Sequence, residues 1–166
     1  MESPDSIYFY SHTKGNFKYM SNFYPSVFVD ADGIEFNCTE QYLMYNKCKL
    51  FDPNNNLMLL KILGEKSPAK IKALGRLVKN YNEYVWNQSR YKVMVNGLKL
   101  KFTQNQQIAN NLIQTSPKML YEAAPNDNIW GIGFDAVTAA VTKDKTCFGS
   151  NLLGQALVQV RGELIG

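Results

Sequence analysis

The stretch Phe36-Asn-Cys-Thr-Glu40-Gln-Tyr-Leu-Met-Tyr-Asn-Lys47-Cys-Lys49 indicates the end of a strand followed by the start of a helix. Asn37 with Glu40 three residues later is typical of a helix N-cap, in which Asn37 accepts a first-turn amide. Glu40 and Lys47 then share one helix face, two turns and about 10 Å apart. That separation is too wide for an ion pair and suits a small charged ligand. A capping glutamate and a solvated lysine form the competing interpretation.

The composition is that of one globular domain. The 166 residues are 45% hydrophobic and 19% charged, and 18 basic against 14 acidic residues leave a net charge of +4. We therefore expect a single domain over residues 1–166, with its core at about 7–161. The small positive charge weakly favours anionic partners and falls short of a protein that coats nucleic acid.

Cysteine and histidine are too few and too scattered for a metal site or a disulfide framework. The cysteines are Cys38, Cys48 and Cys147, and the single histidine, His12, lies in a polar, turn-like segment. We expect no metal and no cofactor, so that any catalysis depends on carboxylates, lysine, arginine and water. The N-terminus lacks a signal-peptide pattern and no run approaches 18 apolar residues, which predicts a cytoplasmic location and no membrane partner.

Capping residues and periodicity predict one α+β domain in which helices dominate. Strands are expected at 7–11, 27–29, 34–36 and 119–124, the middle two forming a hairpin around Asp30-Ala-Asp-Gly33. After the helix from Glu40, further helices are expected at 57–63, 69–78, 82–103, 106–114 and 151–161. The mixed segment 136–149 is interpreted as an exposed loop.

Three other places combine residue types that suit a ligand. The loop at 22–24 joins asparagine to two aromatics, although a packed surface loop is the plainer interpretation. Arg90 falls in the apolar stripe of the long helix, so it either pairs with a buried carboxylate or meets an anion. Between Asp127 and Gly133, a carboxylate, Trp130 and two glycines fit either a ligand or a tight loop with a buried tryptophan.

Seven short motifs follow one another along nearly the whole chain. They are Ser21-Asn-Phe-Tyr-Pro25, Glu40-Gln-Tyr42 with Lys47, Gly75-Arg76, Trp86 with Arg90, Lys101-Phe102 with Asn105, Asp127-x-x-Trp130-Gly-x-Gly133, and Asn151-x-Leu-Gly154 with Arg161. In this order the chain resembles the NADAR family, also called YbiA-like N-glycosidases, from about Ile7 to Arg161. It departs from the family where Gln41 replaces the histidine of many members and where Leu43-Met-Tyr-Asn46 replaces another run. Those changes bear on the choice of substrate.

The resemblance implies a mostly helical α+β fold with a small, largely antiparallel sheet, and hydrolysis of a C–N glycosidic bond at a ribose. The implied substrates are phosphorylated ribosylamino-pyrimidine intermediates of riboflavin synthesis, or ADP-ribose attached to a nucleobase such as guanine. ADP-ribosylated DNA is a partner that the resemblance allows. The alternative is a non-catalytic module that binds ADP-ribose or NAD. A nucleic-acid-binding protein is a third interpretation, disfavoured because the basic residues are spread along the chain.

Cleavage of an N-glycosidic bond builds positive charge on the sugar, so an anion near the anomeric carbon and a base for water both help. We assign the main catalytic role to Glu40 and the second polar role to Asp127 or Glu122. Lys47 either donates to the leaving group or contacts phosphate. Residues expected to stack on the base, hold phosphate or bring backbone to the ligand are Asn22, Phe23, Tyr24, Arg76, Trp86, Arg90, Lys101, Trp130, Gly131, Gly133 and Asn151.

Overall fold

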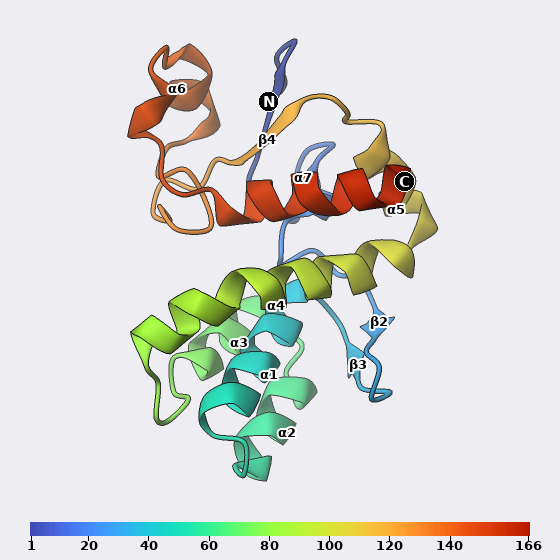
Figure 1. The fold of residues 1–166 in the computed structure, drawn as a ribbon, viewed down its shortest axis with the longest axis vertical. Coiled ribbons are helices and arrows are strands. Elements are labelled where there is room, and N and C mark those ends of the chain that lie inside the picture. The colour runs from blue at the N-terminus through green and yellow to red at the C-terminus, as the bar shows by residue number, and fades with distance from the viewer. The chain divides into compact units, whose positions relative to one another are not determined.

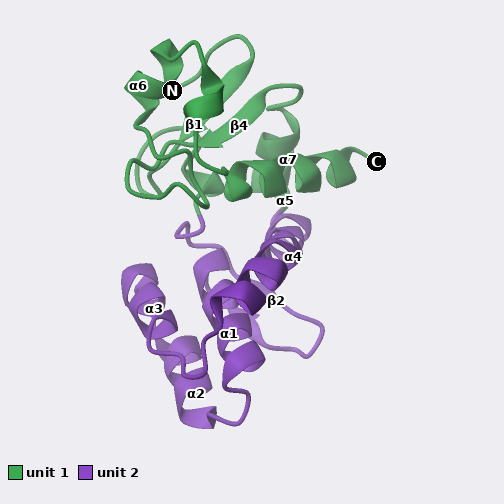
Figure 2. Ribbon diagram, turned by 60° about the vertical axis from the view of Figure 1, so that its left-hand side comes forward, with its two compact units in different colours: residues 1–21, 106–166 green, residues 22–105 purple.

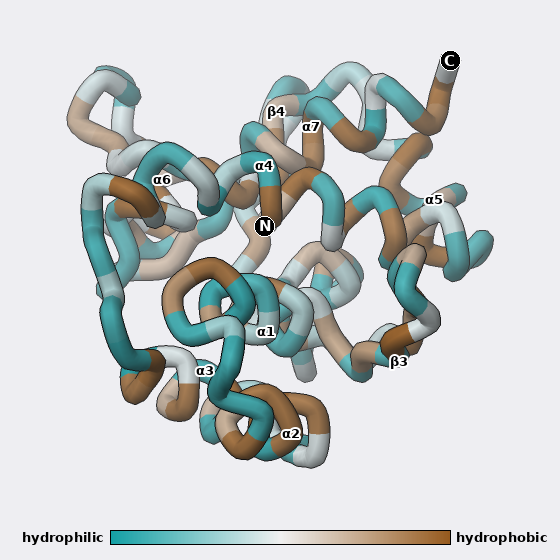
Figure 3. The backbone as a smooth tube through the Cα atoms, turned by 60° about the horizontal axis from the view of Figure 1, so that its bottom comes forward, coloured by the Kyte–Doolittle hydropathy of each residue, from teal (hydrophilic) through white to brown (hydrophobic).

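The computed structural model describes residues 1–166, which form two compact units (Figure 2). Unit 1 combines residues 1–21 with 106–166, and unit 2 is the continuous segment 22–105. Helices dominate both units and strands are few, as the sequence predicts. Polar and apolar residues alternate along the helices (Figure 3), so that each can bury one side. None of these helices combines the length and the apolar character that a membrane span requires.

Unit 2 is built around α1 (Thr39–Phe51), which contacts the other three helices of the unit (Figure 1). These are α2 (Asn56–Gly64), α3 (Pro68–Gly75) and α4 (Glu83–Thr103). The side chains that meet between them are apolar and buried, among them Leu43, Cys48, Ile62, Ile71, Met94, Leu98 and Phe102. Burial of this apolar surface is the main source of stability for the unit.

Side-chain caps begin the other three helices of this unit. Asn55, Ser67 and Asn82 each accept a first-turn backbone N–H of α2, α3 and α4, respectively. Pro68 follows Ser67 in the first turn of α3, where its missing N–H has no helical partner to lose. The starts of these helices are therefore fixed by residues next to them in the sequence.

The start of α1 differs from the prediction. The N-cap is Cys38, without a side-chain cap, and Asn37 Nδ2 instead donates to Glu65 O at 3.1 Å. Gln41 occupies the site between them: its Oε1 accepts the Asn37 N–H at 2.7 Å, and its Nε2 donates to Ile62 O at 3.0 Å and Glu65 O at 3.2 Å. The cap is lost because these distant carbonyls at the end of α2 compete for the same side chains.

The predicted hairpin is confirmed. The strands β2 (Phe28–Val29) and β3 (Glu35–Phe36) pair antiparallel. Asp30 Oδ1 accepts the Ile34 N–H at 2.9 Å, and Gly33 adopts a φ of 78°, which closes the turn.

Unit 1 contains one parallel strand pair. Here β1 (Ser6–Phe9) lies beside β4 (Met119–Glu122), with the 3-10 helix η1 (Lys18–Met20) following β1. The helix α7 (Leu152–Ile165) packs on β4 and on α5 (Gln106–Ile113). The two sheets are thus one parallel and one antiparallel pair, whereas a largely antiparallel sheet was expected. No turn residue signals the direction of β1 against β4, because they come from distant parts of the chain.

The segment 136–149 is not the loop that its composition suggested. It contains α6 (Ala136–Val141) and a second 3-10 helix, η2 (Lys145–Cys147). Asp135 caps α6 by accepting two backbone N–H groups at 2.9 Å each. Ala139 is buried in a small apolar cluster, and this tertiary contact stabilises a helix that is too short to persist alone.

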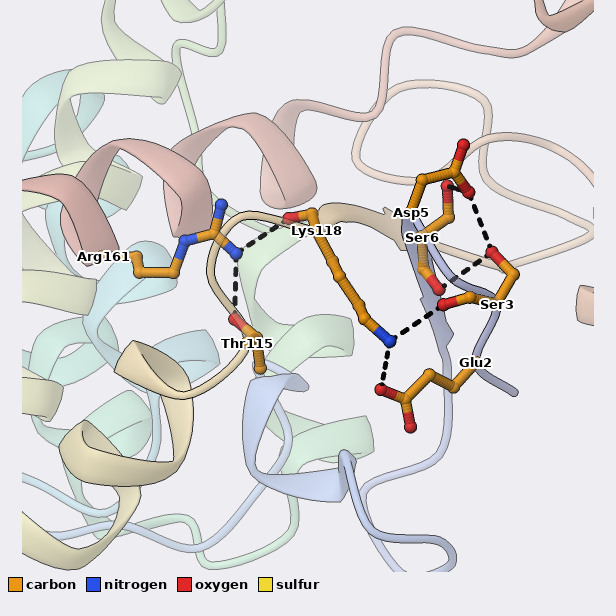
Figure 4. Close-up of polar contacts among 7 residues, drawn as sticks. All are labelled: Glu2, Ser3, Asp5, Ser6, Thr115, Lys118 and Arg161. Carbon is orange, nitrogen blue, oxygen red and sulfur yellow. Dashed lines mark hydrogen bonds and ion pairs between the residues drawn. The ribbon is translucent and has the colours of Figure 1, made fainter.

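Two basic residues tie the segments of unit 1 together (Figure 4). The buried Arg161 on α7 donates from Nη1 to Thr115 Oγ1 at 2.9 Å and to Lys118 O at 2.8 Å. Lys118 Nζ in turn pairs with Glu2 Oε1 at 2.6 Å and donates to Ser3 O at 2.9 Å. The C-terminal helix, the turn before β4 and the N-terminal segment are therefore joined by polar contacts as well as by the core.

Candidate functional site

The predicted site residues fall into two groups, one in each unit. Unit 2 holds Asn22, Phe23, Tyr24, Glu40, Lys47, Arg76, Trp86, Arg90 and Lys101. Unit 1 holds Glu122, Asp127, Trp130, Gly131, Gly133 and Asn151. Inside each unit the fold brings together residues that are far apart in the sequence.

Glu40 lies in the first turn of α1 and is buried. Its backbone N–H donates to Asn22 O at 3.0 Å, which joins the loop at 22–24 to the start of the helix. Asn22 Oδ1 is buried and has no hydrogen-bond partner. Because buried polar atoms are nearly always paired, an acceptor left open beside a buried carboxylate is a candidate contact for a ligand.

Lys47 lies among aromatic rings. Its Nζ is 4.6 Å from the centroid of the Tyr81 ring and 6.0 Å from that of Trp86. Phe51 packs against both, with ring centroids at 5.4 Å from Tyr81 and 6.4 Å from Trp86. Trp86 is only 6% exposed. Trp86 is therefore a buried neighbour of the Lys47 ammonium, and little of its ring surface is accessible for stacking with a base.

The electrostatics of Lys47 link it to two other candidates. Burial lowers its pKa from the ordinary value, the carboxylate of Glu40 opposes that shift, and the positive charge of Arg76 adds to it. The expected sharing of one helix face by Glu40 and Lys47 thus brings them within electrostatic reach of each other. A lysine whose proton is held less tightly is suited to donating that proton.

Arg90 and Arg76 differ in their exposure to solvent. Arg90 is half-buried on α4, and its Nε is buried without a hydrogen-bond partner. The buried N–H at Nε is therefore available to an acceptor. Arg76 is exposed at the C-cap of α3.

Lys101 is wholly inside the protein, with an exposed fraction of 0%. Its Nζ is 5.6 Å from the centroid of the Tyr24 ring and 5.2 Å from that of Phe102. Burial lowers its pKa to about 7, and the nearby Cys38 thiol opposes the shift. From this buried position Lys101 contacts the ring of Tyr24 and supports the loop that contains it.

In unit 1, the Asp127 carboxylate organises its own loop. Asp127 Oδ1 accepts the N–H groups of Ile129 at 2.9 Å and Trp130 at 2.8 Å. The Asp127 carbonyl accepts the Gly133 N–H at 3.0 Å, and Gly133 adopts a φ of 75°. This is the tight-loop interpretation of the segment, with Trp130 left half-buried.

The backbone around Glu122 is held from both sides. Asn151 Oδ1 accepts the Glu122 N–H at 3.0 Å, and Asn151 Nδ2 donates to Leu120 O at 2.9 Å. On the other side Glu122 O accepts the Ile132 N–H at 2.9 Å. A Cβ at Gly131 would lie 2.8 Å from Glu122 O, so only glycine permits this approach. Asn151 and Gly131 therefore position Glu122.

Sequence reasoning missed three residues near Glu40 and Lys47. Tyr81 lies beside the Lys47 ammonium with Trp86, Phe51 packs against both rings, and the Thr39 hydroxyl is buried without a partner. No local pattern marks them, because the contacts join α1 to the connection between α3 and α4. The structure holds no cluster of three or more histidine, cysteine or carboxylate side chains that could bind a metal.

Comparison with known proteins relates the chain to one domain family. The model of the NADAR domain matches residues 8–165 and so spans both units. A protein named N-glycosidase from Acanthamoeba polyphaga mimivirus is 32% identical over 98% of this chain and 98% of its own length. A protein of Vibrio vulnificus (strain YJ016), named as a riboflavin biosynthesis protein, is 30% identical over 99% of this chain and 39% of its length. The NMR structure of the E. coli protein YbiA matches with a TM-score of 0.77 and 27% identity, covering 99% of this chain and 88% of YbiA.

Proposed function

Because the chain belongs to the NADAR family, we propose that it is an N-glycosidase that hydrolyses a C–N bond at a ribose. The name of the mimivirus relative, which aligns over almost its full length, supports this class of reaction. The observation that carries the proposal is the arrangement on α1. A buried carboxylate, Glu40, and a half-buried lysine of lowered pKa, Lys47, lie on one helix face.

In the proposed reaction, water attacks the anomeric carbon while the bond from that carbon to the base nitrogen breaks. Glu40 stabilises the positive charge that develops on the sugar and accepts the proton of the attacking water. Lys47 gives a proton to the departing nitrogen, which its lowered pKa favours. The products are the free sugar, with a hydroxyl at the anomeric carbon, and the protonated amine of the base.

Two arginines of unit 2 would contact the phosphate groups of the substrate. The open Nε of Arg90 and the exposed guanidinium of Arg76 are suited to phosphate oxygens. Of the two candidates for the second acid, Asp127 and Glu122, Asp127 already accepts two backbone N–H groups through Oδ1. Both an ADP-ribosyl nucleobase and a phosphoribosylamino-pyrimidine present the ribose, phosphate and flat ring that these residues would bind.

The test is a mass-spectrometric turnover assay on two substrates, a phosphoribosylamino-pyrimidine and an oligonucleotide with ADP-ribosyl guanine. Glu40→Gln keeps the shape of the side chain and removes its charge. We expect turnover to fall by about 100-fold or more with the fold intact, as judged by circular dichroism. Glu35→Gln, which removes a charge from an exposed position on β3, is the matched control and should retain activity.

The substrates distinguish the outcomes. Release of ribose phosphate from the first identifies a nucleotide hydrolase, and release of ADP-ribose from the second identifies an eraser of base ADP-ribosylation. Near wild-type turnover in Glu40→Gln contradicts the role of Glu40. Tight binding of both substrates without product contradicts hydrolysis and favours a non-catalytic binding module.

A further inference from the structure

Positive charge in unit 2 is concentrated in and around α3. Residues 66–79 hold five basic residues and no acidic ones, whereas the whole chain carries only +4. These residues are Lys66, Lys70, Lys72, Arg76 and Lys79, and all five are exposed. The basic residues are therefore clustered in this segment, although the net charge of the whole chain is small.

Buried residues alternate with the cations along α3 and the connection that follows it. Ile71 and Gly75 on α3 and Val78 in the connection to α4 are buried. Lys72, Arg76 and Lys79 each directly follow one of these buried residues and are exposed.

No ion pair joins these five cations to an acidic side chain, although the Glu65 carboxylate interacts electrostatically with Lys70. Glu65 also accepts the backbone N–H groups of Lys66 and Ser67 through Oε1. Like charges at i, i+4 destabilise a helix, and Lys70 in the first turn of α3 also opposes the helix dipole. The unbound protein therefore carries an electrostatic cost here that a polyanion would relieve.

Exposed aromatic and apolar side chains continue this surface into α4. Leu77 is 64% exposed, Tyr81 47% and Tyr84 74%. The ring of Tyr81 also lies under the ammonium of Lys47, so the surface is continuous with the candidate site. Glu83, next to Tyr84, is the one acidic residue at this end and lies in the first turn of α4, where its charge favours the helix dipole.

We propose that the outer face of α3 and its connection to α4 is a docking surface for single-stranded nucleic acid. Exposed cations meet the phosphates, while Tyr81 and Tyr84 offer rings on which bases stack. The aromatic rings favour a strand over an anionic lipid surface, because bases supply flat partners for them. The inference rests on the proposed function in one respect: it assigns the scissile base to a strand that this surface holds.

The first measurement is the affinity of the full chain for an unmodified fluorescent strand of about 12 nucleotides at several salt concentrations. The variant replaces Lys70, Lys72 and Lys79 with glutamine, and leaves Arg76 and Lys47 in place. At low salt we expect binding to weaken by at least about 10-fold, and the slope of log affinity against log salt to fall by about 2. Tyr84→Ser should weaken binding with the salt slope unchanged.

The matched control removes the same charge from unit 1, by replacing Lys14, Lys18 and Lys143, all exposed, with glutamine. Binding close to that of the wild type is expected. An equal loss in the control shows a net-charge effect and overturns the proposal. Absence of strand binding, or binding to anionic vesicles without strand binding, also overturns it.

Turnover separates this inference from the proposed function. The triple lysine variant should hydrolyse a free nucleotide substrate at the wild-type rate, and lose activity on a modified strand at low strand concentration. Strand binding without turnover of any substrate contradicts the proposed function and leaves the docking surface standing. Turnover of free nucleotide without strand binding supports the proposed function and contradicts the docking surface.

Discussion

The two lysines of unit 2 show how position changes the chemistry of one residue type. Lys47 is half-buried beside aromatic rings and near Glu40, whereas Lys101 is wholly enclosed. Burial lowers the pKa of both, and that of Lys101 falls to about 7. Lys47 is thus suited to proton transfer at a ligand. Lys101 affects the stability of the fold as the pH changes.

The buried Lys101 should make stability depend on pH in a defined direction. Its pKa is about 7 when folded and near the ordinary 10.5 when unfolded, so between these values the unfolded chain binds more protons. The destabilisation is complete below pH 7 and is relieved as the pH rises towards 10.5. Relative to Lys101→Met, which does not titrate, the wild type should therefore gain about 1 kcal/mol per pH unit in that window.

Urea unfolding of both proteins at pH 7, 8 and 9 measures this gain. Lys92→Met, at an exposed position on the same helix, should differ from the wild type by a constant amount across the series. Parallel stability curves for wild type and Lys101→Met would show that Lys101 keeps its ordinary pKa in the folded state.

At the scale of elements, α7 depends on a close approach to β4. A Cβ at Gly154 would collide with Leu120 O and with the side chain of Asn151. The same Asn151 binds Leu120 O and the Glu122 N–H, so the helix start and the strand form one tightly packed joint. The joint therefore fixes the backbone of Glu122.

Two glycines of α7 should respond oppositely to alanine. Gly154→Ala should destabilise the protein by about 2 kcal/mol or more, because backbone and an already bonded amide must move. Gly162→Ala meets nothing within 4 Å and should stabilise by about 0.5–1 kcal/mol through helix propensity. Thermal unfolding of the pair checks this. A loss of stability at Gly162 as large as that at Gly154 would contradict the close-approach account.

At the scale of the whole molecule, the two units differ in how the chain builds them. Unit 2 is one continuous segment, while unit 1 joins the first 21 residues to 106–166. The core of unit 1 therefore depends on pairing between β1 and β4 across a long intervening segment. Ile7 pairs with Leu120 and both are buried, whereas Met119 on the same strand is exposed.

Weakening β1 should consequently loosen the distant β4. Ile7→Ala should cost about 2–4 kcal/mol, because it leaves a cavity in the core of unit 1. Native-state hydrogen exchange should speed up at Leu120–Glu122 as well as at Ser6–Phe9. Met119→Ala, at the exposed position, should leave both segments protected. Faster exchange confined to the first strand would show that β4 is held without β1.

The sequence by itself determined the helices other than α6, the hairpin and the order of motifs that marks the family. Asn55, Ser67 and Asn82 act on backbone groups within three residues, and Asp30 with Gly33 closes a turn in the same way. Such local effects can be read from neighbouring residues. The shared face of Glu40 and Lys47 follows from helical spacing for the same reason.

Only the tertiary structure decided which side chains meet across elements. Asn37 does not cap α1 but donates to the Glu65 carbonyl. Packing in an apolar cluster stabilises α6, where the local sequence predicts a loop, and β1 pairs parallel to β4. The tertiary structure also places Tyr81 and Trp86 beside Lys47. These outcomes depend on packing between segments far apart in the chain, where the competition among buried partners outweighs the preferences of neighbouring residues.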